Sequence, residues 1–200
     1  MKKFIYTVLT LCTLAAVSSC KDDSLSPYKV PEAGLGGFGA LTAGSFKESN
    51  FAGSKVDVEV KWISVDNKIE AEKIELYVNF YEEYIDKDGN PAVATHGGAV
   101  GKTSSALVVS GTANRAAGKV SITAQQVYDL FKDAKFKYDG KTEVAVFGAN
   151  RPATKRFLIG DSFDVTWRIY GKNGLVYKSW SPSTCVEIVG YNCYVEWAVQ

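Results

Sequence analysis

Residues 56–62 read VDVEVKW, a strict alternation of apolar and charged side chains. Successive side chains of a β-strand point to opposite faces, so this period of two indicates a strand with one buried face and one wet face. Residues 74–81 (IELYVNFY) and 163–170 (FDVTWRIY) alternate in the same way. These three stretches favour a protein built from half-buried strands.

Further strands are expected outside these three stretches. Shorter runs lie at 105–110, 119–123, 143–148, 175–180, 184–189 and 193–199. Many short strands separated by turn residues are typical of a sandwich. We therefore predict an all-β fold, an antiparallel immunoglobulin- or fibronectin-like β-sandwich with one short helix. The helix is expected to begin after Thr123, which can form a capping box with Gln126.

The turn at residues 172–174 (KNG) joins two of the predicted strands. A two-residue and a four-residue loop both pair even positions with odd ones. Either loop would place Val176 and Trp180 on the same face as Trp167, and Tyr177 on the opposite face beside Tyr170.

Residues 1–19 predict export from the cytoplasm. Lys2 and Lys3 precede an apolar run at 4–17, which is shorter than the roughly 20 residues needed to span a bilayer as a helix. The run ends in VSSC at 17–20 and resembles the lipobox of bacterial lipoproteins. That resemblance implies cleavage before Cys20 and acylation of Cys20, with two or more acyl chains giving lasting anchorage. The alternative is an ordinary secretory signal followed by a chance cysteine.

Residues 21–23 (KDD) look like the charged export tag of Bacteroidetes-type lipoproteins. This likeness implies a lipid-anchored protein of the outer membrane, exposed at the cell surface. The periplasmic leaflet, with KDD as a plain solvated linker, is the alternative. Residues 20–50 are rich in Ser, Gly, Pro and Ala, which predicts a lipidated cysteine followed by a flexible spacer whose end can add an edge strand. Residues 51–200 are then the sandwich domain.

The four cysteines divide into three groups. Cys12 leaves with the signal peptide and Cys20 carries lipid, so Cys185 and Cys193 remain in a compartment that permits disulfides. We predict a bridge between them, and two separately buried thiols are the alternative.

Composition and motifs argue against several functions. The 23 basic and 22 acidic residues give a net charge of +1, without the basic excess of nucleic-acid-binding proteins. His96 is the one histidine, and it stands where the phosphate-binding loop resembled by 97–103 (GGAVGKT) requires its first glycine. The DKDGN sequence at 86–90 is followed by Pro91 and Gly97 at the positions where a calcium-binding EF-hand loop has its glycine and its glutamate. We expect no cofactor, no metal, no nucleic acid and no catalytic residues, while an enzyme built from distant carboxylates stays open.

The aromatic residues, which include 11 Tyr and 4 Trp, suggest a binding surface. The candidate ligand-binding residues are Tyr77, Asn79, Tyr81, Arg168, Tyr170 and Tyr177, all expected on outer faces of strands. An aromatic ring covers the apolar face of a pyranose while amides and guanidinium groups bind its hydroxyls. Ordinary cross-strand pairing of tyrosines, or burial under another layer, are the alternatives.

The lipobox, the KDD tag, the spacer and the small all-β domain together resemble accessory lipoproteins of Sus-like (starch-utilisation-like) glycan uptake systems. Residues 161–167 (DSFDVTW), 180–182 (WSP) and the pair Cys185 and Cys193 loosely resemble other lipoproteins associated with those transporters. The resemblance implies a non-catalytic component of a nutrient-uptake system, with an outer-membrane transporter complex and an extracellular glycan as partners. The alternatives are a structural or adhesive cell-surface subunit acting through protein–protein contacts, and a hydrolase with convergent carboxylates in a cleft.

Overall fold

The computed structural model describes residues 34–64, 66–97, 107–110, 113–148, 151–181, 185 and 192–200, with backbone alone for 107–110. The elements are β1 (Leu35–Ser45), η3 (Glu48–Asn50), β2 (Lys55–Ser64), β3 (Ala71–Ile85), β4 (Pro91–His96), β5 (Leu107–Ser110), β6 (Ala117–Thr123), α2 (Ala124–Phe131), β7 (Lys135–Phe136), β8 (Val144–Ala145), β9 (Ser162–Gly171), β10 (Val176–Lys178) and β11 (Val195–Ala198). No helix within this described part is long and apolar enough to cross a membrane. The signal peptide, Cys20, residues 21–23 and most of 97–103 lie outside the described residues.

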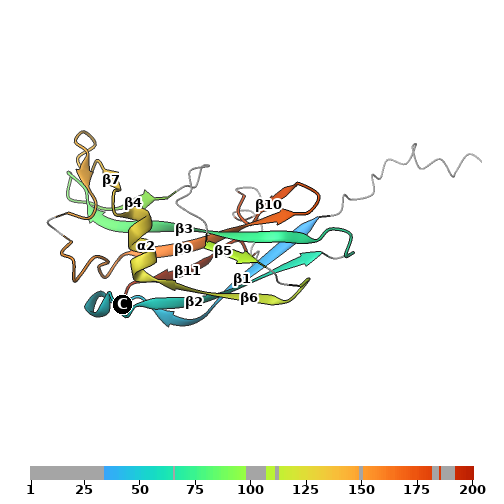
Figure 1. Cartoon of the computed structure of the whole chain (residues 1–200). Helices are drawn as coiled ribbons and strands as arrows, with labels where there is room; N and C mark the ends of the chain where they lie inside the picture. The colour runs from blue at the N-terminus through green and yellow to red at the C-terminus, as the bar shows by residue number, and fades with distance from the viewer. Residues whose placement is uncertain are drawn as a thin grey trace, which may run out of the picture. The chain divides into compact units, whose positions relative to one another are not determined.

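The strands form two antiparallel sheets that face each other (Figure 1). One sheet has the order β1-β2-β6. The other has the order β10-β9-β3-β4, with β11 also paired to β9 and β5 also paired to β3. A small third sheet joins β7 and β8. The predicted antiparallel β-sandwich with one short helix is confirmed.

The core lies where the alternating strands present their apolar faces to each other. Val56, Val58 and Val60 of β2 are almost fully buried, as are Phe163 and Val165 of β9. Burying each such side chain contributes about 1.5–3 kcal/mol relative to leaving it exposed. The period of two in the sequence therefore marks the inner face of each sheet correctly.

Strand β1 is an edge strand within residues 20–50, the stretch interpreted from the sequence as a spacer whose end can add such a strand. It pairs with β2 from Leu35, opposite Ser64, to Ser45, opposite Lys55. A Cβ atom at Gly37 would lie 2.3 Å from Nε1 of Trp167, and one at Gly39 would lie 2.5 Å from Cζ3 of the same ring. These glycines allow the backbone of β1 to approach the indole closely, so their role is packing within a strand.

The β9–β10 hairpin corrects the predicted register. Val176 pairs with Tyr170 and Tyr177 pairs with Ile169, so even positions face even ones. A three-residue loop at 172–174 produces this register, with Gly174 at a φ of +79° as in a type I turn followed by a bulge. Val176 therefore shares a face with Tyr170, whereas Tyr177 lies on the face of Ile169.

Helix α2 runs across the strands near one end of the sandwich (Figure 1). Its predicted capping box is confirmed, because the Thr123 hydroxyl accepts from the Gln126 backbone N–H at 3.1 Å and the Gln126 side chain accepts from the Thr123 N–H at 2.8 Å. Val127 and Phe131 bury the apolar side of the helix in the core.

The Cys185–Cys193 disulfide is also confirmed, and Cys193 is buried beside β11. The strand expected at 184–189 lies outside the described residues except for Cys185. Strands β4 and β7 were not expected from the sequence.

Candidate ligand-binding groove

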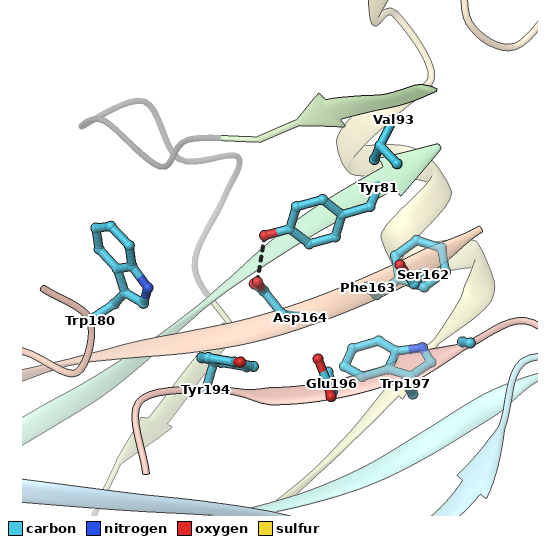
Figure 2. Close-up of a pocket in the computed structure, with 10 residues that line it drawn as sticks. Tyr81, Val93, Ser162, Phe163, Asp164, Trp180, Tyr194, Glu196 and Trp197 are labelled. Carbon is cyan, nitrogen blue, oxygen red and sulfur yellow. Dashed lines mark hydrogen bonds between the residues drawn. The ribbon is translucent and has the colours of Figure 1, made fainter. Parts of the chain in front are cut away.

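An open groove of about 720 Å³ lies over β3, β4, β9 and β11 of the six-stranded sheet (Figure 2). We call it the outer groove. The residues that line it are Tyr81, Val93, Ser162, Phe163, Asp164, Trp180, Tyr194, Glu196, Trp197 and Ala198. Its polar side chains come from the strand faces that point away from the core, which leaves them available to a ligand.

Strand register gathers polar groups from three strands into one row across the floor of the groove. Asn79 of β3 is directly opposite Asp164 of β9, and Asp164 is directly opposite Glu196 of β11. Side chains opposite one another in antiparallel strands have Cβ atoms about 4.5–5.5 Å apart. Two carboxylates from strands distant in sequence therefore become close neighbours.

Asp164 is held by two hydrogen bonds. Its Oδ1 accepts from the Asn79 amide at 2.6 Å, and its Oδ2 accepts from the Tyr81 hydroxyl at 2.6 Å (Figure 2). Burial raises the pKa of Asp164 and the negative charge of Glu196 adds to this effect, while the two hydrogen bonds offset only part of it. Burial and the bond to Asp164 also raise the pKa of Tyr81, which keeps its hydroxyl a donor.

Glu196 differs from Asp164 because it is exposed and makes no hydrogen bond or ion pair with the described residues. Like charges directly opposite each other in a sheet are destabilising. No Lys or Arg is among the described residues that line the groove. The groove therefore concentrates negative charge that the described part of the chain leaves unbalanced.

Two aromatic rings lie beside the carboxylates. Trp180 is 37% exposed and Tyr194 is 43% exposed, and both side chains line the groove (Figure 2). Ser179 continues the β9 pairing through a hydrogen bond from its N–H to the Trp167 carbonyl at 2.9 Å. This register puts Trp180 over the outer face, whereas the sequence placed it on the core side.

Three of the residues predicted from the sequence form a separate cluster around Glu75. The hydroxyls of Tyr170 and Tyr77 donate to Oε2 of Glu75 at 2.6 and 2.5 Å, and the Arg168 guanidinium lies 4.3 Å from the centre of the Tyr77 ring. Burial would raise the pKa of Glu75, but hydrogen bonds from Lys73 and the tyrosines lower it to about 2. The polar groups of these side chains therefore bond to one another, as those of cross-strand pairs do.

The remaining predicted residues divide between the groove and the opposite face. Tyr81 lines the groove, and Asn79 supports it through a hydrogen bond to Asp164. Tyr177 belongs to neither cluster, and its hydroxyl accepts from the Asn173 amide at 3.1 Å. Its predicted place beside Tyr170 is wrong because the hairpin register is shifted by one residue.

Sequence reasoning missed Asp164, Trp180, Tyr194 and Glu196 as binding residues. The alternation in 163–170 and 193–199 does place Asp164 and Glu196 on outer faces. However, nothing local says that β11 pairs with β9, so their proximity could not be predicted.

A second group of titratable residues lies on the inner side of the same sheet. We call it the inner ionic cluster, and its members are Glu82, His96, Tyr138, Arg151 and Asp161. Oε2 of Glu82 accepts from Tyr138 at 2.6 Å and lies 2.9 Å from Nε2 of His96. Arg151 donates from Nε and Nη2 to Oε1 of Glu82, at 3.2 and 2.8 Å.

The other donors of Arg151 are also used. Nη1 and Nη2 donate to Asp161 at 2.6 and 3.0 Å, and Nη1 donates to the Arg156 carbonyl at 3.1 Å. All five N–H groups of the guanidinium are thereby satisfied. A pocket of about 380 Å³ adjoins Glu82 and Arg151, but these side chains have their hydrogen bonds within the cluster, so we assign it a structural role.

Within the described residues, no group of three or more His, Cys, Asp or Glu side chains is arranged to hold a metal ion. No protein-family model matches the chain, and no curated protein is significantly similar to it. The likeness to accessory lipoproteins of glycan uptake systems therefore stays a prediction.

Proposed function

We propose that the protein is a non-catalytic, lipid-anchored protein of the outer membrane that captures an extracellular glycan in the outer groove for an associated transporter. The observation that carries the proposal is the meeting of two exposed rings, Trp180 and Tyr194, with the carboxylates of Asp164 and Glu196 in one open groove. The groove volume of about 720 Å³ falls within the range of small-molecule sites.

This set of groups matches the two surfaces of a sugar. The exposed rings of Trp180 and Tyr194 can cover the apolar C–H face of a pyranose. The carboxylate of Glu196 is free to accept hydrogen bonds from sugar hydroxyls, since the described residues do not occupy it. Charged acceptors form stronger hydrogen bonds than neutral ones.

The hydrogen bonds of Asp164 favour binding over bond cleavage. Glycoside hydrolysis needs one carboxylic acid that presents a proton to the leaving oxygen. Both oxygens of Asp164 instead accept hydrogen bonds from Asn79 and Tyr81. The groove still brings two carboxylates together, so the test of function must include an assay for hydrolysis.

An adhesive subunit acting by strand addition would need an accessible edge strand. The longest edge strand, β1, is capped at Gly39 by the Asn192 side chain, which accepts from the Gly39 N–H at 2.6 Å and donates to its carbonyl at 2.9 Å. Asn192 therefore occupies the backbone groups of β1 that strand addition at Gly39 would need.

Membrane attachment is proposed from the lipobox and Cys20. A Cys20→Ala variant should no longer incorporate labelled fatty acid and should leave the membrane fraction. Protease added to intact cells should digest the native protein if the KDD tag directs surface display. Retention of the variant in membranes without label would contradict lipid anchoring.

Glycan binding is tested by affinity gel electrophoresis of the full chain in detergent against a panel of polysaccharides. We expect at least one polysaccharide to retard the native protein, and Trp180→Ala to weaken the binding by about two- to tenfold, because stacking contributes roughly 0.5–1.5 kcal/mol per ring. The matched control is Phe38→Ala, which removes a 46% exposed ring from β1 of the other sheet.

Two results would overturn the proposal. One is that no polysaccharide retards the native protein, or that both variants bind equally. The other is the release of reducing sugar from the bound polysaccharide, which would identify a hydrolase.

A further inference from the structure

The outer groove has a charge that a neutral glycan would leave unbalanced. Asp164 and Glu196 are directly opposite in the strand register, and no Lys or Arg is among the described residues that line the groove. The nearest outer-face cation along β9, Arg168, pairs with Glu75 in register and lies over the Tyr77 ring at 4.3 Å. The described residues thus supply hydrogen bonds to Asp164 but no countercharge to the carboxylate pair.

The partial burial of one member strengthens the repulsion within the pair. Asp164 is partly buried, so its interaction with Glu196 is screened less than that of two carboxylates in water. The raised pKa of Asp164 reflects the same burial and the same neighbouring charge. A ligand that brings a positive charge between these two side chains gains the attraction of both.

The aromatic residues add to this preference. Trp180 and Tyr194 line the same groove as the carboxylates (Figure 2). The face of an aromatic ring attracts a cation within about 6 Å of its centre, and Trp is the strongest such residue. The same two rings can therefore stack on a sugar and stabilise an ammonium group carried by it.

From this arrangement we propose that the outer groove selects glycans that carry a protonated primary amine, namely amino sugars without an N-acetyl group, and rejects glycans that carry carboxylates. The inference rests on the proposed glycan-binding function and names its substrate class. Glu196 is the specificity-determining residue, because it is exposed and its charge has no partner among the described residues. The sugar ring binds by stacking, and the amine binds by charge.

The test is isothermal titration of the full chain in detergent with three oligosaccharides of equal length, made of glucosamine, N-acetylglucosamine or galacturonate. Titrations are run at about pH 6.5, where carboxyls with ordinary pKa values near 4 are ionised. We expect the glucosamine oligomer to bind about five- to tenfold tighter than its acetylated form, and the galacturonate oligomer to bind most weakly. The preference should shrink as salt rises from about 50 to about 500 mM.

The variant that tests the mechanism is Glu196→Gln, and its matched control is Glu72→Gln, which removes an exposed carboxylate from β3. We expect Glu196→Gln to bind the glucosamine and N-acetylglucosamine oligomers with affinities within about twofold of each other, since only charge attraction is lost. Glu72→Gln should keep the native preference. A thermal melt of each variant shows that both remain folded.

The outcomes distinguish a failure of charge selection from a failure of glycan binding. Equal binding of the aminated and acetylated oligomers, or an unchanged preference in Glu196→Gln, overturns the charge selection and leaves glycan binding in place. Binding of none of the three oligomers, together with no retardation by any polysaccharide, overturns the glycan-binding function itself.

Discussion

Each face of the six-stranded sheet carries a cluster that contains carboxylates, and the two clusters differ in how these carboxylates are paired. In the inner ionic cluster, Glu82 is bonded to Tyr138 and Arg151 and lies within hydrogen-bond distance of His96. In the outer groove, Glu196 has no partner among the described residues, although it lies opposite a second carboxylate. The same sheet thus gives Glu82 hydrogen-bonding partners and a countercharge, and leaves Glu196 without either among the described residues.

The difference shows which charges serve the fold. An unpaired charge in the core costs several kcal/mol, so a buried carboxylate persists only with partners that satisfy it. A carboxylate in an open groove is hydrated, so leaving it unpaired costs much less. The inner cluster is therefore a structural cross-link, and the groove retains charge that a ligand can use.

The largest expected effect comes from removing the cation of the inner ionic cluster. Arg151→Ala leaves Glu82 and Asp161 buried without their countercharge, and we expect the free energy of unfolding to fall by about 3–5 kcal/mol. Chemical denaturation measures it. The control is Lys155→Ala, which breaks an exposed ion pair with Glu48 and should cost less than about 1 kcal/mol. Similar losses in both variants would show that the inner ionic cluster contributes no more to stability than an exposed ion pair.

A matched pair of tyrosines compares the two clusters directly. Tyr138 and Tyr81 each donate to a carboxylate at 2.6 Å, the first to Glu82 and the second to Asp164. Tyr138→Phe should cost about 1.5–3 kcal/mol because it removes a hydrogen bond to a buried charge. Tyr81→Phe should cost less than about 1 kcal/mol, since water from the groove can replace the hydroxyl. Urea denaturation of both variants measures the two losses in the free energy of unfolding. Equal losses would show that the groove is as dry as the core.

Acid should weaken the inner ionic cluster. Burial alone would raise the pKa of Glu82, but hydrogen bonds from His96 and Tyr138 and the charge of Arg151 lower it below the ordinary value of 4.5. A lowered pKa means that the stabilisation is present above about pH 4.5 and is lost as the pH falls through the folded-state value.

The variant that isolates this effect is Glu82→Gln, compared with the native protein in denaturation curves at several pH values. Its destabilisation should be greatest at neutral pH and should shrink on acidification, because Glu82 of the native protein then loses its own charge. A constant difference at every pH would mean that Glu82 is not ionised in the folded protein.

The smallest expected effect is a gain in stability. Glu196→Gln removes the repulsion on Asp164 and should raise the free energy of unfolding by about 0.5 kcal/mol at neutral pH. Burial and Glu196 raise the pKa of Asp164 above its ordinary 3.8. The contribution of Asp164 is therefore most favourable below about pH 3.8 and declines as the pH rises through its folded value.

The gain from Glu196→Gln should accordingly vanish in acid, where Asp164 is protonated in the native protein too. Differential scanning calorimetry at neutral and acidic pH measures it. A variant that is more stable at neutral pH and yet loses selectivity for aminated sugars would show that the groove keeps its charge for binding. A loss of stability would assign Glu196 to the fold.

Local sequence rules predicted those strands and the helix that are specified by residues close together in the chain. The alternation in 56–62 and 163–170 marked β2 and β9 with their inner faces, and the pair Thr123 and Gln126 marked the start of α2. At β1 the rules gave only a spacer whose end can add an edge strand, because glycines that permit close approach to Trp167 have the same composition as a flexible spacer. They failed at 172–174, where a loop longer or shorter by one residue exchanges the faces of Val176 and Tyr177.

The candidate site was only partly predictable for the same reason. Tyr81 and Asn79 were expected on an outer face, where Tyr81 lines the groove and Asn79 bonds to Asp164. Strand β11 also pairs with β9, although β10 lies between them in the chain, and no short-range rule selects that pairing. Without it, Glu196 and Tyr194 have no relation to Tyr81.

The amino-acid sequence alone determined the sandwich class, the inner faces of the main strands, the capped helix and the cysteine pair. Each of these depends on side-chain period or on partners close in the chain. Only the tertiary structure decided that Asp164 faces Glu196, that Trp180 lies over the groove, and that Arg151 reaches Glu82. Those contacts join residues from separate strands and loops, and their positions depend on strand order and register, which the whole core determines together.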